Sequence, residues 1–211
     1  MRIAWFVSFI AVTLLLFVQP ALASVVINEA LFNPSGGSDT GFEKIELYNN
    51  SSSLADLTGW ELYPDGIGYF IFPQGFTLGP KSFVAIHLRS PGTNDALNLY
   101  HPGAGDNMGD SSGSVALFSG KPYGKDTIVD FVRYKKGTSD VKTWESAAST
   151  AGLWVAGQFI DISTLQAGNS VALTSDGVRG GASLWQIASL PTIGGSNTGN
   201  GYISLNSSSS D

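Results

Sequence analysis

The sequence predicts an all-β protein built as an antiparallel sandwich, and two observations lead to this prediction. Short apolar or alternating stretches recur along the chain and are separated by turn residues. The chain has 26 Gly, and only 13% of its residues are charged, which suits short strands joined by turns. It contains no Cys, so a secreted form would depend on its apolar core and not on disulfides for stability.

The first 23 residues have the pattern of a signal peptide. Arg2 supplies the only charge of this stretch, and residues 3–18 are almost entirely apolar. Pro20 then interrupts any helix, and small residues precede the expected cleavage point between Ala23 and Ser24. An uncleaved anchor is the less favoured alternative, because a membrane span needs roughly 20 apolar residues and this run is shorter.

The mature chain, residues 24–211, is expected to be secreted, in the extracellular space, in the periplasm or at the cell surface. No second apolar run follows the leader, so we expect no membrane span after its removal. Loss of Arg2 leaves 10 basic residues against 17 acidic ones, a formal net charge of −7. Nucleic acid and anionic lipid are therefore unfavourable partners, because proteins bind phosphates mainly through basic residues.

The apolar patterns predict strands at eight places in the chain: 24–31, 44–48, 60–63, 69–72, 83–88, 114–118, 127–134 and 170–173. The stretch 44–48 alternates, which places Ile45 and Leu47 on one face and Lys44, Glu46 and Tyr48 on the other. Turn residues separate these stretches.

The remaining elements follow from the same patterns. The stretches 114–118 and 127–134 are expected to form a hairpin joined through residues 120–124, where Gly is frequent. Only residues 141–151 favour a helix, of one or two turns. The sandwich domain is predicted to span residues 24–198, and a polar, Ser-rich tail occupies 199–211.

Four motifs of the chain have the order and spacing of a known family: Ile27-Asn28-Glu29, Ile45-Glu46-Leu47-Tyr48-Asn49, Leu57-Thr58-Gly59-Trp60 and Phe72-Pro73-Gln74-Gly75-Phe76-Thr77-Leu78. In these motifs the chain resembles the lamin tail domain family, and specifically its exported bacterial type. The resemblance continues more loosely over 113–117, 129–132 and 168–173, with Trp185 and Asn197. The end departs from the bacterial pattern, which usually has Thr-Pro-Gly where this chain has residues 190–194.

The resemblance implies an immunoglobulin-like sandwich and, for exported members, a non-catalytic binding module. Such a module would hold a protein or an extracellular polymer at the cell surface or outside the cell. No cofactor is implied, and we expect the protein not to be an enzyme.

A carbohydrate-binding module is the second hypothesis. It depends on a dense set of aromatic residues: Trp60, Tyr63, Tyr69, Phe70, Phe72 and Phe76. Alternation along strands buries about half of such residues, so packing is their favoured role. For Trp60 in particular, we expect a place in the core beside Leu57 and Leu62.

A serine hydrolase is the least favoured hypothesis. Residues 109–113 match G-x-S-x-G around Ser111, but this motif requires a helix to follow, and a strand is predicted there. His87 and His101 are the only histidines, so a catalytic site would have to combine Ser111 with one of them, His101 being the candidate. We therefore predict no catalytic residue.

Two sets of acidic residues are candidates for cation binding. Asn28 and Glu29 could act together with Glu43 or Glu46, although we favour carboxylates that accept backbone N–H groups. The second set, Asp106, Asn107 and Asp110, does not match the D-x-[DN]-x-[DN]-G calcium loop, so we favour solvated turn residues. No metal site is predicted.

Overall fold

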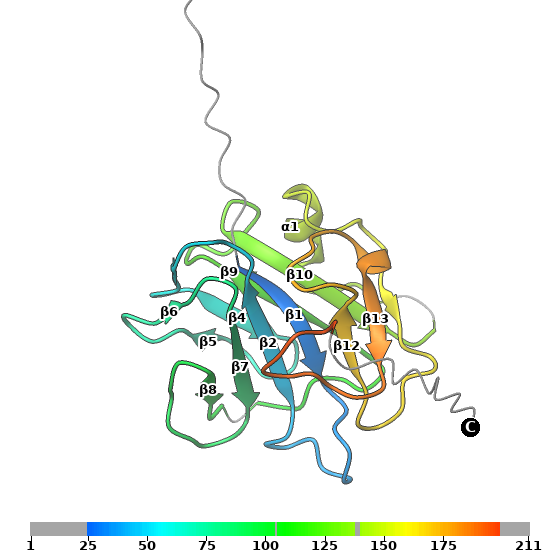
Figure 1. Ribbon diagram of the computed structural model, residues 1–211. Coiled ribbons are helices and arrows are strands. Elements are labelled where there is room, and N and C mark those ends of the chain that lie inside the picture. Colours follow the sequence, from blue (N-terminus) through cyan, green and yellow to red (C-terminus); the bar gives the residue numbers. More distant parts are fainter. Residues whose placement is uncertain (1–24, 104, 138–139, 199–211) are drawn as a thin grey trace, which may run out of the picture.

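Two β-sheets packed face to face make up the body of the protein, with one short helix at the side (Figure 1). The structure is a computed structural model, and it describes residues 25–103, 105–137 and 140–198. The expected signal peptide, with its cleavage point between Ala23 and Ser24, and the polar tail lie outside the described residues. Within the described part of the chain, no helix is both long and apolar enough to cross a membrane.

The larger sheet has six strands, and all neighbours are antiparallel except the last pair, β7 and β8. In spatial order they are β13 (Trp185–Ala188), β12 (Ser170–Leu173), β1 (Val25–Leu31), β2 (Lys44–Asn49), β7 (Phe83–Leu88) and β8 (Asn98–His101).

The second sheet has five strands, and its parallel pair is β11 and β10. In spatial order they are β11 (Ile160–Asp161), β10 (Ile128–Lys135), β9 (Ser112–Phe118), β4 (Glu61–Pro64) and β5 (Phe70–Ile71). Strands β3 (Ala55–Asp56) and β6 (Thr77–Leu78) form a separate antiparallel pair. The helices are α1 (Glu145–Thr150) and a 3₁₀ turn, η1 (Ala182–Leu184).

A single apolar core lies between the two sheets. Strand β1 of the first sheet contacts β9 and β10 of the second. The core residues come from both sheets and include Ile27, Leu47, Leu62, Leu117 and Val132, all with no exposed surface. Each such side chain contributes about 1.5–3 kcal/mol through removal from water, so the core can stabilise the fold without disulfides.

A β-bulge at Asn28 shifts the register of β1. Ile27 pairs with Leu47, but the next residue of β2, Glu46, pairs with Glu29, so Asn28 is the extra residue. The backbone N–H of Ile27 beside the bulge donates to Asp130 Oδ2 of β10 at 2.8 Å and so joins the two sheets. The bulge therefore places Glu29 on the outer face, next to Glu46.

The all-β sandwich, the eight predicted strand regions and the helix at α1 are confirmed, and the hairpin forms between β9 and β10. The strands that the patterns missed are short or at sheet edges: β3, β6, β8, β11 and β13. Two of these edge strands pair in parallel with their neighbours, β8 with β7 and β11 with β10. The sandwich is therefore not wholly antiparallel. Strand β4 begins at Glu61, and Trp60, just before it, is half-buried against the core and not enclosed in it.

Candidate functional site

The outer face of the six-stranded sheet is covered in its middle by the segment that follows β13. This segment, residues 190–198, crosses β1 and β2 and is called the strap below (Figure 1). It contains no helix or strand and is held mainly by side chains of the sheet beneath it. Glu29 and Glu46 have no exposed surface because the strap lies over them.

Glu29 holds the first part of the strap. Both of its carboxylate oxygens accept the Thr192 backbone N–H at 3.0 Å, and Oε2 also accepts the Thr192 hydroxyl at 2.6 Å. The hydroxyl of Ser170, in the neighbouring strand β12, donates to Oε1. Charge-assisted hydrogen bonds of this kind are stronger than neutral ones, so Glu29 is a main anchor of the strap.

Glu46 and Asp176 hold the remainder of the strap. Glu46 accepts the Gly194 N–H at 2.6 Å and the Asn28 side-chain amide at 2.8 Å. Asp176 accepts the Asn197 N–H at 2.9 Å and the same Asn28 amide at 3.0 Å. The side chain of Asn28, placed by the bulge, therefore lies between the two acids and connects them.

These contacts decide between the two roles considered for the acidic residues. Glu29 and Glu46 accept backbone N–H groups, as favoured from the sequence, and Glu43 accepts the Met108 N–H at 2.8 Å. Glu43 does not join the cluster under the strap. Among the residues that the structure describes, no group of three or more His, Asp and Glu side chains is placed to hold a metal ion.

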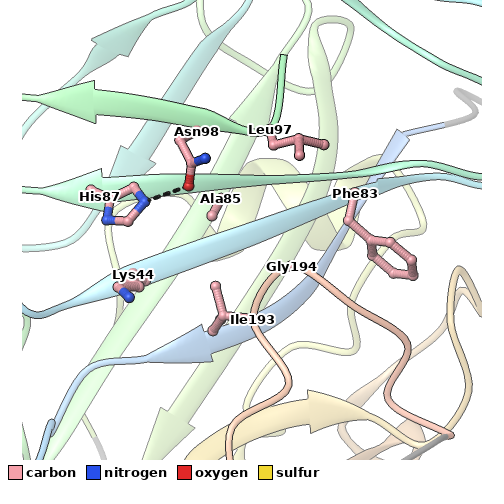
Figure 2. A pocket seen from close by; sticks show the side chains of 8 residues that line it. All are labelled: Lys44, Phe83, Ala85, His87, Leu97, Asn98, Ile193 and Gly194. Carbon is pink, nitrogen blue, oxygen red and sulfur yellow. Dashed lines mark hydrogen bonds between the residues drawn. The ribbon is translucent and has the colours of Figure 1, made fainter. Parts of the chain in front are cut away.

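Beside the strap, the same sheet face carries a groove, which we call the strap groove. Its volume is about 190 Å³. It is formed by residues of β2, β7, β8, the residue just before β8 and the strap: Lys44, Phe83, Ala85, His87, Leu97, Asn98, Ile193 and Gly194 (Figure 2). The apolar side chains provide the walls, and the polar ones gather at one end.

The polar end of the strap groove is built from three neighbouring strands. Lys44 of β2 lies opposite His87 of β7 in the strand register. His87 Nε2 is 2.9 Å from Asn98 Oδ1 of β8, and its ring stacks on Tyr100 with centroids 4.6 Å apart. These two contacts orient the imidazole. Lys44 forms no ion pair with any described residue.

A family model described as the Lamin Tail Domain matches residues 19–136. The match covers more than half of the chain. This protein belongs to the lamin tail domain family. The family consists of immunoglobulin-like, non-catalytic domains, in agreement with the sandwich seen here. A comparison with curated proteins found no match.

The aromatic residues of this lamin tail domain divide between the core and the outer face of the second sheet. Phe70 and Phe72 are buried. Tyr69 stacks on Tyr123 with centroids 4.3 Å apart, and Tyr63 packs on Tyr69 at 4.7 Å. Because the rings cover one another, they do not present the row of free faces that sugar binding uses. The sequence did not indicate Tyr123, which lies more than 50 residues further along the chain.

The residues proposed for a hydrolase do not form a catalytic pair. Ser111 is exposed, and β9 starts at the next residue, so no helix follows the serine as a nucleophile elbow requires. His101 is buried, its Nδ1 accepts the Gly103 N–H at 3.2 Å, and burial lowers its pKa. No hydrogen bond joins Ser111 and His101 among the described residues.

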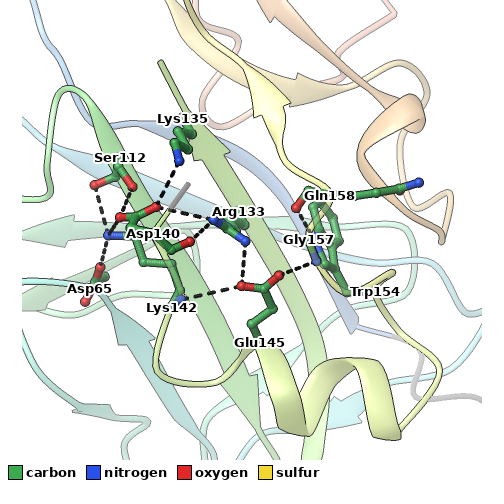
Figure 3. A network of polar contacts seen from close by, with 10 residues as sticks. All are labelled: Asp65, Ser112, Arg133, Lys135, Asp140, Lys142, Glu145, Trp154, Gly157 and Gln158. Carbon is green, nitrogen blue, oxygen red and sulfur yellow. Dashed lines mark hydrogen bonds and ion pairs between the residues drawn. The ribbon is translucent and has the colours of Figure 1, made fainter. Parts of the chain in front are cut away.

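On the second sheet, a network of charged side chains attaches α1 to β10 (Figure 3). Arg133 of β10 pairs with Glu145 of α1 at 2.6 Å, and both are almost fully buried. Glu145 also accepts the Gly157 N–H at 2.7 Å. Arg133 pairs with Asp140 as well, at 3.3 Å. Because its positive and negative groups already pair with one another, this network has a structural role.

Proposed function

We propose that this lamin tail domain is an exported, non-catalytic binding module that holds a protein or polymer partner at the cell surface or outside the cell. We further propose that the partner docks in the strap groove. The observation that carries the proposal is the combination, in one groove on a sheet face, of apolar walls and a lysine that forms no ion pair with a described residue. Loops and exposed side chains on such scaffolds commonly provide binding surfaces.

Leu97 is the best position at which to test docking. It lines the groove, yet 64% of its surface is exposed, so a charged replacement should leave the fold intact. Leu97→Asp should remove retention of the secreted chain on the producing cells. The matched control is Leu54→Asp, a leucine with 68% exposure that does not line the groove, and it should be retained as the unchanged chain is.

Retention can be measured by separating washed cells from the medium and quantifying the chain in each fraction. Equal retention of both variants would place the binding surface elsewhere on the domain. Export is tested in the same samples, because the amino terminus of the released chain should be Ser24. A chain that stays in the cytoplasm with Met1 present would contradict the export proposal.

A further inference from the structure

We infer that the strap groove receives an aspartate or glutamate side chain of a protein partner, with the carboxylate at Lys44 and the methylenes against the apolar walls. This inference rests on the proposed function, because it names the chemistry of the ligand for the same groove.

The charge of the groove is the first argument. Five described cations form ion pairs: Lys121, Lys125, Arg133, Lys135 and Lys142. Lys44, like Lys81, Arg89 and Lys136, forms none with a described residue, and no Asp or Glu lines the groove. An incoming carboxylate would be the first ion-pair partner of this ammonium group. The negative charge of the whole chain opposes such a ligand weakly, because charges more than about 8 Å away are screened at physiological ionic strength.

The hydrogen-bonding groups at the polar end are the second argument. When His87 donates through Nε2, Asn98 uses its oxygen as the acceptor, and its amide nitrogen keeps one N–H group beyond the one that it donates to Asp95 Oδ1 at 3.4 Å. The nearest acid, Asp95, already accepts the backbone N–H groups of Leu97 and Asn98 at 2.8 and 2.7 Å. The groove therefore offers mainly donors, and a carboxylate, which only accepts, matches them.

Size and apolar lining are the third argument. A groove of about 190 Å³ accommodates one side chain and not a folded surface. Phe83 and Ile193 line the groove, and Phe83 lies at the end away from His87 and Lys44 (Figure 2). Methylene groups of a ligand can be removed from water against these side chains. A purely aliphatic ligand would fill the walls but would leave the ammonium of Lys44 partly desolvated without compensation, which is unfavourable.

The test uses two short peptides that differ only in one side chain, which ends in a carboxylate in the first and in an amide in the second. Acetyl-Leu-Glu-Leu-amide and acetyl-Leu-Gln-Leu-amide are titrated into the isotope-labelled chain, and NMR signals of His87, Asn98 and Gly194 report binding. We expect saturable shifts with the Glu peptide and a dissociation constant up to about fivefold weaker with the Gln peptide, as for an exposed ion pair.

Lys44→Gln should weaken binding of the Glu peptide by the same factor and leave the Gln peptide unchanged. Lys125→Gln, in an exposed pair with Asp126, is the matched control and should change neither. Equal binding of the two peptides, or no effect of Lys44→Gln, would overturn the inference. The same holds if neither peptide shifts these signals.

A dimer of galacturonic acid serves as a third ligand. If it shifts the groove signals and the Glu peptide does not, the groove recognises acidic polysaccharide and the protein partner is wrong. These outcomes are independent of the retention experiment, since Leu97→Asp reports groove-dependent docking whatever the ligand chemistry is.

Discussion

All five glutamates of the chain are buried, so the acidic surface consists of aspartates. Burial raises the pKa of Glu43 to about 8, although its hydrogen bond from the Met108 N–H acts in the opposite direction. Burial likewise raises the pKa of Glu46 to about 8, against the effect of the Asn28 amide. Residues that appear in sequence as surface charges are here internal parts of the sandwich.

These two residues predict a pH dependence of stability. In the unfolded chain each carboxyl group loses its proton near pH 4.5, whereas the folded chain retains it up to about pH 8. The free energy of unfolding should therefore be highest near pH 5 and should fall as the pH rises to about 9. Urea unfolding at pH 5, 7 and 9 measures this decrease.

Glu43→Gln should make the free energy of unfolding fall less between pH 5 and pH 9, because the amide imitates the protonated acid at every pH. Glu43 is the better choice of the two, since its Oε2 is buried without a hydrogen-bond partner. The variant should match the unchanged chain at pH 5 and exceed it at pH 9. Asp106→Asn, at an exposed acid, is the control. An unchanged slope in Glu43→Gln would show that Glu43 is not the titrating group.

At Glu29 the carboxylate itself is required. Glu29→Gln puts an NH₂ group where the strap presents donors, so we expect a loss of about 2–4 kcal/mol in the free energy of unfolding. Hydrogen exchange of the Thr192 amide should accelerate as the strap loosens. Asp126→Asn, at an exposed acid, should change neither quantity. Unaltered exchange at Thr192 would mean that other contacts hold the strap.

At the scale of elements, the strap explains how the chain tolerates its departure from the bacterial pattern. Residues 190–194 differ from the expected Thr-Pro-Gly. The sheet nevertheless binds this segment, largely by accepting hydrogen bonds from the backbone N–H groups of Thr192 and Gly194. The side chain of Asn197 additionally donates to the carbonyls of Asn28 and Leu173. No strand forms after β13 among the described residues, since side-chain hydrogen bonds hold the strap in place of backbone hydrogen bonds between strands.

Helix α1 depends on its buried ion pair. Glu145→Ala leaves the Arg133 guanidinium without its main partner in the interior, so we expect a loss of about 3–5 kcal/mol. The double variant Arg133→Met, Glu145→Leu removes both charges and should be more stable than Glu145→Ala alone. Urea unfolding of the three proteins decides this. If the double variant is less stable than Glu145→Ala, the attraction between the two charges stabilises α1 by more than the cost of burying them.

At the scale of the whole molecule, the sandwich is completed by residues beyond the family match. The match ends at residue 136, but β12 and β13 continue the six-stranded sheet beside β1, and β11 extends the other sheet. Without them, one side of β1 would lose its hydrogen-bond partners and the strap would be missing.

A chain of residues 24–136 should therefore fail to fold, whereas residues 24–198 should fold. Far-ultraviolet circular dichroism and the dispersion of amide NMR signals distinguish the two results. Cooperative thermal unfolding of the shorter chain would refute the requirement for β12 and the strap. Both chains begin at residue 24, so any difference in folding between them is due to residues 137–198.

The sequence alone determined the β class, most strands and the position of α1. Alternation in residues 44–48 and the apolar run in 83–88 are local patterns, and the backbone geometry of a strand follows directly from them. The family motifs added that the sandwich is of the immunoglobulin-like type, because their order and spacing are specific.

The tertiary structure alone decided which groups the polar residues contact. Glu29 and Thr192 are separated by 163 positions, and Arg133 approaches Glu145 only after α1 folds back on β10. The short edge strands β8 and β11 carry too few residues to show a period, and no local pattern indicates that they pair in parallel with β7 and β10. Local patterns fix local geometry, whereas burial of a charge and the shape of a groove are set by residues far apart in the chain. For that reason Ile27-Asn28-Glu29 is readable as a strand from sequence, but as the anchor of a strap only from the fold.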